Sequence, residues 1–132
     1  MITDTAGVER FVRARIRSAP GELLIIDPYF GKNGQGWNLL TTRKGLTRIL
    51  TGRAASPPPV SLPLVQARSL PTPPPYHDRV YVWQGGGLSI GASAGGLAGN
   101  RAFRIDYLGT VESVRWRASF ETWWTDKDAQ PV

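Results

Sequence analysis

The sequence predicts an α/β fold in which a mixed β-sheet is flanked by helices. Apolar residues recur at helical spacing near both ends of the chain, and short apolar or alternating segments typical of strands lie between them. Glycine and proline separate these segments. Outside a proline-rich insert, the resulting order is helix, strand, helix, four strands and helix, and such an order layers helices on a sheet. Because a length of 132 residues suits one domain, we expect a single domain over residues 1–132.

The first part of the chain is expected to contribute two helices and two strands. Apolar side chains of residues 5–19 share one helical face, and Pro20 and Gly21 end that segment. Residues 22–27 are nearly all apolar and too few for a surface helix, so we expect a buried strand there. The segments expected to follow are a loop over 28–36, a short helix over 37–44 and a strand over 46–50.

A proline-rich insert occupies residues 57–75. Prolines at 57–59 and 73–75 exclude a helix and favour extended backbone. Residues 64–70 between them can form one strand. We interpret the insert as two rigid connectors around that strand, and the alternative is a proline-rich ligand for another protein.

The last part of the chain predicts three strands and a closing helix. Residues 79–84 alternate in polarity, and Gly85, Gly86 and Gly87 are expected to join them to the next strand. The closing helix has a wide aromatic face. The expected elements are strands over 79–84, 88–93 and 103–108 and a helix from Thr110, and the helix positions expected to pack at spacings of three, four and seven are Val114, Trp116, Ala118, Phe120, Trp123 and Trp124.

Composition limits the classes of function. The net charge is +6 and most of the cations are arginines, which bind phosphate with a planar fork. The face of the first helix opposite its apolar residues carries Arg10, Arg13 and Arg17. This face can be interpreted either as a solvated surface or as a surface that binds a polyanion. The chain has no cysteine, which excludes disulfides and thiolate metal sites and suits a reducing compartment. No run of 18 apolar residues occurs, so we expect a cytoplasmic protein without a membrane partner.

The only histidine of the chain, His77, stands where a loop enters a strand. Side chains at such a position project from a rigid frame. Arg79 is two residues further on and therefore shares one face of the strand with His77. The glycines around Gly91 and the hydroxyl of Ser93 then offer a turn that an anion can approach closely. This pattern predicts a phosphate site.

These residues resemble the HxKxxxxD motif of the phospholipase D superfamily. Counted from His77, Arg79 stands at the lysine position, Gln84 at the aspartate position and Gly91 at the glycine that follows, with Ser93 close behind. The first strand and the terminal tryptophan-rich helix also resemble members of this family. The resemblance leaves out only the proline-rich insert, and it implies a phospholipase D-like α/β/α domain with a single motif.

The resemblance also implies a set of roles. In that family a histidine attacks phosphorus to form a phosphohistidine, and a second histidine protonates the leaving oxygen. On this chain His77 would be the nucleophile or the acid, while Arg79 and Ser93 would hold phosphate oxygens. The substrate-binding residues would be Gln84, Gly91 and Asp27.

This chemistry needs two histidines and the chain has one, so the resemblance implies a homodimer in which two copies of His77 meet. The implied function is a nuclease that needs no metal and no cofactor, with DNA or RNA favoured by the basic charge. Gln84 departs from the motif because an amide supplies no charge. The alternative is therefore a catalytically degraded domain that binds nucleic acid or serves assembly in a larger complex, for example one of defence.

Overall fold

One mixed sheet runs through the computed structural model, which describes residues 5–71, 73–76, 78–92 and 103–132. The described residues form seven strands in the order β6-β5-β4-β1-β2-β3-β7. The central strands β1, β2 and β3 are parallel, and the remaining pairs are antiparallel. The strands are β1 (Leu23–Ile26), β2 (Thr47–Gly52), β3 (Val65–Leu70), β4 (Arg79–Trp83), β5 (Gly86–Ala92), β6 (Phe103–Leu108) and β7 (Gln130–Pro131).

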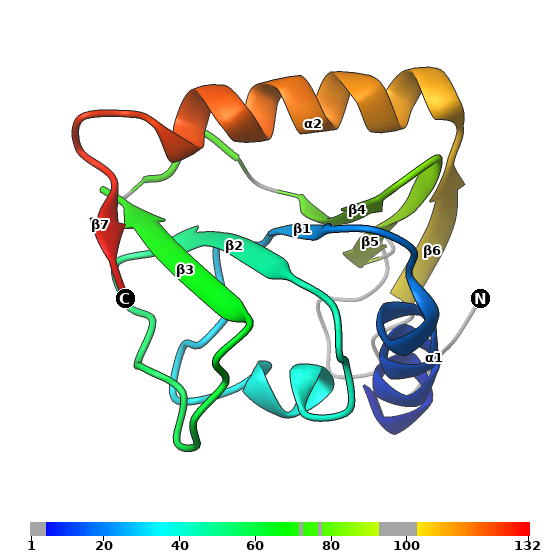
Figure 1. Ribbon diagram of the computed structural model, residues 1–132, viewed down its shortest axis with the longest axis horizontal. Coiled ribbons are helices and arrows are strands. Elements are labelled where there is room, and N and C mark those ends of the chain that lie inside the picture. Colours follow the sequence, from blue (N-terminus) through cyan, green and yellow to red (C-terminus); the bar gives the residue numbers. More distant parts are fainter. Residues whose placement is uncertain (1–4, 72, 77, 93–102) are drawn as a thin grey trace.

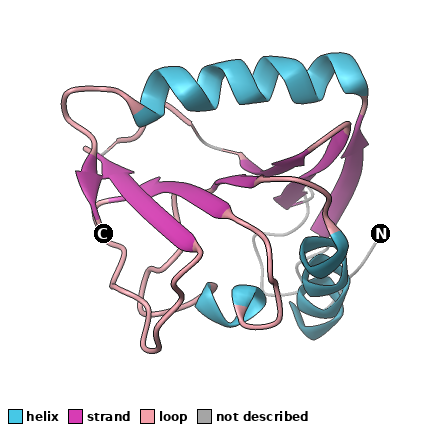
Figure 2. Cartoon of the chain, viewed as in Figure 1, coloured by secondary structure: helices cyan, strands magenta, loops and turns pink. Residues whose placement is uncertain are grey.

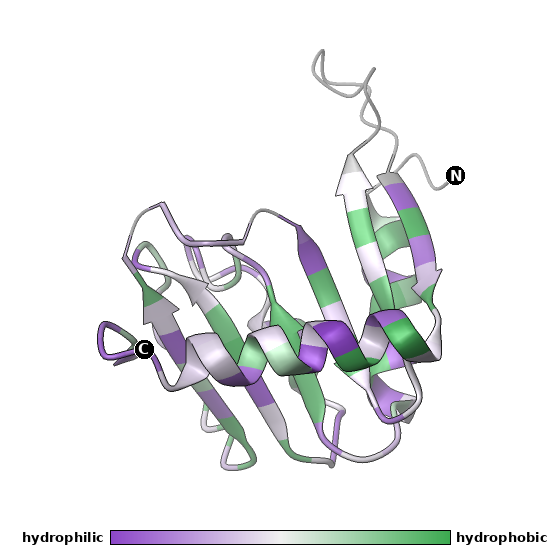
Figure 3. Ribbon diagram, turned by 90° about the horizontal axis from the view of Figure 1, so that it is seen from above, coloured by the Kyte–Doolittle hydropathy of each residue, from purple (hydrophilic) through white to green (hydrophobic). Residues whose placement is uncertain are grey.

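Helices cover both faces of this sheet (Figures 1 and 2). Helix α1 (Thr5–Ser18) and the short 3-10 helix η1 (Trp37–Leu40) lie on one face, and α2 (Thr110–Trp124) lies on the other. Figure 3 shows α2 lying across the strands. All four residues of β1 are fully buried because this strand is central and covered on both faces.

The core on the α1 face joins the helix to the sheet and to the loop after β1. Val12 and Ile16 are the buried residues of α1, which agrees with the predicted apolar face. Phe30 and Trp37 pack edge to face at 5.1 Å, and the indole N–H of Trp37 donates to the carbonyl of Ser56 at 2.9 Å. This bond satisfies the buried donor of the indole and fixes the loop under the sheet.

The core on the α2 face is built on the predicted aromatic residues. Phe120 and Trp124 are buried and stack at 5.4 Å, while Trp116 and Trp123 are half-buried against the same cluster. Val114 departs from the prediction because the residue is 61% exposed. The aromatic rings fill the space between helix and sheet, so the small apolar residues of α2 face outward.

Other sequence predictions were refined or corrected. The sheet confirms the α/β class with a mixed sheet between helices, and β3 is the predicted strand within the proline-rich insert. The glycine turn was placed wrongly, because Trp83 pairs with Gly86 and the connection is therefore Gln84 and Gly85 alone. Strand β7 was not predicted. No helix that the structure describes is long and apolar enough to cross a bilayer.

Candidate nucleic-acid interface

The structure brings together two of the described residues that the phosphate-site prediction named. Asp27 follows β1 and Arg79 begins β4, and these strands are adjacent with Ile26 opposite Val80. Both side chains line one cleft. His77 and Ser93 lie outside the described residues.

The other two predicted residues lie elsewhere. Gln84 is at the opposite end of β4 from Arg79, and its backbone N–H donates to the carbonyl of Pro20 at 3.3 Å. Gly91 is in β5, opposite Arg104, and no atom of the described residues would lie within 4 Å of a Cβ added to it. Neither residue lines the cleft. Among the described residues of the predicted site, the cleft therefore brings together only Asp27 and Arg79.

The cleft lies between α1, the loop after β1 and the start of β4, and it has a volume of about 600 Å³. Its described walls carry the carboxyl groups of Glu9 and Asp27 and the guanidinium of Arg79. The Arg79 guanidinium carbon lies 6.0 Å from the centre of the Tyr29 ring. Two carboxyl groups beside one cation do not give the positive field that a phosphodiester requires. The charges that line the cleft therefore disfavour phosphate binding there.

Asp27 has an unusual environment for a carboxyl group. The residue is 7% exposed, and its Oδ1 accepts a hydrogen bond from the backbone N–H of Tyr29 at 2.8 Å. Burial raises the pKa of Asp27 above its ordinary value, and the bond from Tyr29 and the charge of Arg79 offset this only in part. The charged form of Asp27 therefore opposes folding.

We expect Asp27→Asn to stabilise the protein at pH 8, raising Tm by about 3 °C. Asn removes the buried charge and keeps an oxygen that can accept the bond from Tyr29. Because the pKa of Asp27 is raised in the folded state, wild-type stability should increase as the pH falls through the folded pKa. The difference in Tm between Asp27→Asn and wild type should therefore narrow as the pH falls through the folded pKa of Asp27. Thermal unfolding at several pH values measures it, and a variant less stable than wild type at pH 8 would contradict the prediction.

Much of the positive charge has a structural role. Four arginines bind backbone carbonyls or carboxylates inside the fold rather than facing solvent freely. Arg53 donates to the carbonyl of Asp128, and Arg68 donates to the carbonyl of Trp124 at 2.7 Å. These four are Arg43, Arg48, Arg53 and Arg68. The net charge alone therefore overstates the cationic surface that is available to a partner.

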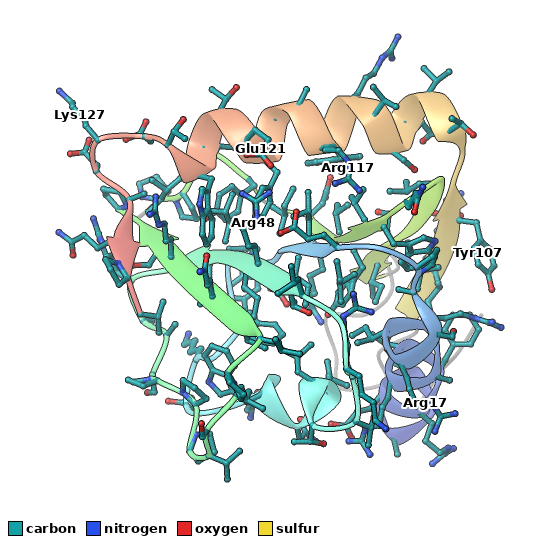
Figure 4. All side chains as sticks on the ribbon, viewed as in Figure 1. Arg17, Arg48, Tyr107, Arg117, Glu121 and Lys127 are labelled. Carbon is teal, nitrogen blue, oxygen red and sulfur yellow. The ribbon has the colours of Figure 1, made fainter. Side chains whose placement is uncertain are left out.

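Arg48 is the clearest of these structural cations. It lies between α2 and the sheet, where Figure 4 shows it beside Glu121, and it bonds Glu22 at 2.9 Å as well as Glu121. Its guanidinium also covers the rings of Phe120 and Trp124 at 5.1 and 5.2 Å. Burial lowers the pKa of Arg48, but the bonds to both glutamates outweigh that effect and raise it. Arg48 thus holds α2 on the sheet and contributes nothing to a free surface.

Helix α1 carries cations of a different kind. Its sequence holds four arginines and one glutamate, and only Arg13 is near that glutamate, with 4.0 Å between Arg13 and Glu9. Among the residues that the structure describes, Arg10, Arg15 and Arg17 are exposed and form no ion pair. These three guanidinium groups are free to meet an anion.

Aromatic side chains border these cations. Phe11 of α1 contacts Tyr107 of β6 with ring centres 6.4 Å apart, and Arg15 lies over the Phe11 ring at 5.0 Å. Tyr107 is 62% exposed, and Figure 4 shows Arg17 and Tyr107 both projecting outward on the side where α1 and β6 lie. We name this region the α1 surface, which consists of Arg10, Phe11, Arg15, Arg17 and Tyr107.

Part of this surface could be predicted from the sequence. Helical spacing identified Arg10 and Arg17 on the polar face of α1. It did not identify Arg15, which helical spacing places beside Phe11, or Tyr107, which required the packing of β6 beside α1.

Comparison with known proteins finds a similarity in fold. No family model matches the chain, and no curated protein matches its sequence. Among solved structures, the chain is similar to TrmBL2, described as an archaeal chromatin protein with a novel mode of DNA binding. The TM-score is 0.65 at 11% identity, and the match covers 99% of this chain and 52% of TrmBL2. The likeness shows a shared fold, and this chain spans about half the length of that protein.

This finding corrects the predicted activity. The neighbouring structure is described for DNA binding rather than for cleavage of phosphodiesters. The sequence-based prediction of a phospholipase D-like phosphodiesterase, a hydrolase acting as a nuclease, is therefore wrong. The dispersal of the predicted residues agrees with this correction, because Gln84 is at the far end of β4 and Asp27 adds an acid beside Arg79.

Proposed function

We propose that this domain binds double-stranded DNA through the α1 surface, without cleaving it. The observation that carries the proposal is the group of three exposed arginines on α1, which form no ion pair among the described residues. The similarity in fold to a DNA-binding chromatin protein supports the same conclusion.

The geometry of α1 suits a phosphate backbone. Arg10 and Arg17 are seven residues apart on one helical face, which separates them by about 10 Å along the axis. Guanidinium groups bind phosphate oxygens through two parallel hydrogen bonds, and each neutralised phosphate releases counterions. The exposed Tyr107 ring adds a flat surface beside these cations. Such a surface favours contacts to the backbone and does not specify a base sequence.

We further propose that the domain keeps a phospholipase D-like architecture without turnover. The motif around Arg79 alone supports this architecture, and DNA binding by α1 does not require it.

We expect the triple variant Arg10→Gln, Arg15→Gln and Arg17→Gln to bind duplex DNA at least about 10-fold more weakly than wild type at moderate salt. Three lost phosphate contacts should also reduce the slope of log K against log salt by about 2 to 3. Fluorescence anisotropy with a labelled duplex over a salt series measures both quantities.

A second triple variant serves as the control. Lys44, Arg115 and Lys127 are exposed cations outside α1, and changing them to glutamine removes the same charge. This variant should keep nearly all of the affinity and the salt slope. Equal losses in the two triples would mean that net charge, and not the α1 surface, accounts for binding, and no loss in the α1 triple would overturn the proposal.

A further inference from the structure

The two edge strands of the sheet, β7 and β6, differ in how well they prevent pairing with a strand of another molecule. Strand β7 has two residues and contains Pro131, which lacks an N–H group. A short strand with proline is a common means of blocking an edge. Strand β6 at the other edge has six residues, FRIDYL, with neither proline nor lysine. No strand within the described ranges pairs with the outer side of β6, so its outward N–H and C=O groups can accept another strand.

The charges on β6 select a particular partner. Arg104 and Asp106 flank Ile105 on the same side of the strand, and their side chains are 71% and 53% exposed. If two copies of β6 pair antiparallel with Ile105 opposite Ile105, Arg104 of each copy falls opposite Asp106 of the partner. The pairing contains two complementary ion pairs and no like-charge contact. In the isolated chain Arg104 is 3.0 Å from Asp106, so both groups are already held at this edge.

We propose that β6 pairs with β6 of a second copy of this chain in this register, which makes a twofold dimer with one continuous sheet. The twofold axis crosses the sheet at Ile105, so the same faces of the two sheets stay on the same side. Helix α1 packs beside β6 through the contact of Phe11 with Tyr107. The two α1 helices therefore flank the axis on one face, which gives the dimer a wider cationic surface than either copy has. The pairing itself does not depend on DNA.

A charge exchange tests this register. Arg104→Asp places two aspartates opposite each other twice in the dimer, and Asp106→Arg does the same with arginines. Each single variant should weaken self-association by roughly 10- to 30-fold. The double variant Arg104→Asp with Asp106→Arg restores both cross-strand pairs and should restore the dimer. Sedimentation velocity on the full chain, without DNA, measures the association. A wild-type protein that is monomeric, or a double variant as weak as the singles, would overturn the proposal.

A crosslink provides a second readout that does not rely on altered charge. The chain has no cysteine, so Ile105→Cys introduces a single thiol. Paired Cα atoms across antiparallel strands are about 4.5 to 5.5 Å apart, within the range of a disulfide. Tyr107→Cys is the control, because two copies of position 107 would be about 13 Å apart in the proposed register. Position 107 is also well exposed, so random collisions would favour it. Under mild oxidation Ile105→Cys should form a covalent dimer and Tyr107→Cys should not, and the reverse result would contradict the register.

Discussion

Replacement of Arg43 by methionine is expected to lower the free energy of unfolding by about 2 to 4 kcal/mol. The Arg43 guanidinium connects the end of α1 to the start of β2. It donates hydrogen bonds of 2.7 to 3.1 Å to Thr47 Oγ1 and to the carbonyls of Ile16, Ala19, Gly21 and Leu46. The last carbonyls of a helix have no partner within the helix, and Arg43 supplies one for Ile16. Burial lowers the pKa of Arg43, so desolvation opposes part of this stabilisation. Loss of the guanidinium nevertheless removes its hydrogen bonds to four carbonyls, of which those of Ile16 and Leu46 keep a backbone partner.

Two further variants separate the hydrogen-bonding geometry of the Arg43 guanidinium from its positive charge. Lysine at position 43 keeps the charge but presents its donors from one atom and cannot reach the same carbonyls together. We therefore expect Arg43→Lys to be destabilised to an intermediate extent. Arg10→Met removes an exposed cation of α1 that forms no ion pair among the described residues and should change stability by less than about 0.5 kcal/mol. Urea unfolding measures all three proteins, and an Arg43→Met protein as stable as Arg10→Met would refute the structural role.

Most of the fold could be predicted because local pattern and burial agree. The apolar run of β1 predicted a strand covered on both faces, and the structure covers it with helices on both sides. The apolar spacing in α1 predicted its buried side correctly. Strand β7 could not be predicted, because Gln130 and Pro131 pair with β3 only after α2 has brought the end of the chain across the sheet.

The candidate site was harder to predict because a sequence does not show which charges are free. Arg48 and Arg17 contribute equally to the net charge, but Arg48 forms ion pairs with Glu22 and Glu121 while Arg17 is exposed. Sequence spacing also placed Gln84 with Arg79 in one motif, although they lie at opposite ends of β4. Residues that are close in sequence are therefore far apart in space when they stand at opposite ends of an extended strand.

Gly87 is expected to be the most sensitive glycine that the structure describes. The sequence predicted a turn there, but Gly87 lies within β5 opposite Val82. A Cβ at this position would be 2.4 Å from the carbonyl oxygen of Tyr81 and 3.1 Å from Leu108 Cδ1. The first contact is with backbone, so β4 and β5 would have to separate. We expect Gly87→Ala to lower the free energy of unfolding by about 2 to 4 kcal/mol.

Gly91 is the matched control, since it is in the same strand and no atom of the part of the chain that the structure describes lies within 4 Å of a Cβ added to it. Gly91→Ala should therefore be neutral or slightly stabilising, because alanine restricts the unfolded chain more than glycine does. Urea unfolding of the two variants compares one substitution at two positions of one strand. If both variants lost the same stability, the cause would be a general preference for glycine in β5. A loss of stability confined to Gly87→Ala would instead show that the close approach of β4 requires glycine at this position. The same close approach explains why only Gly85 of the three glycines lies in the turn, while Gly86 and Gly87 continue as strand.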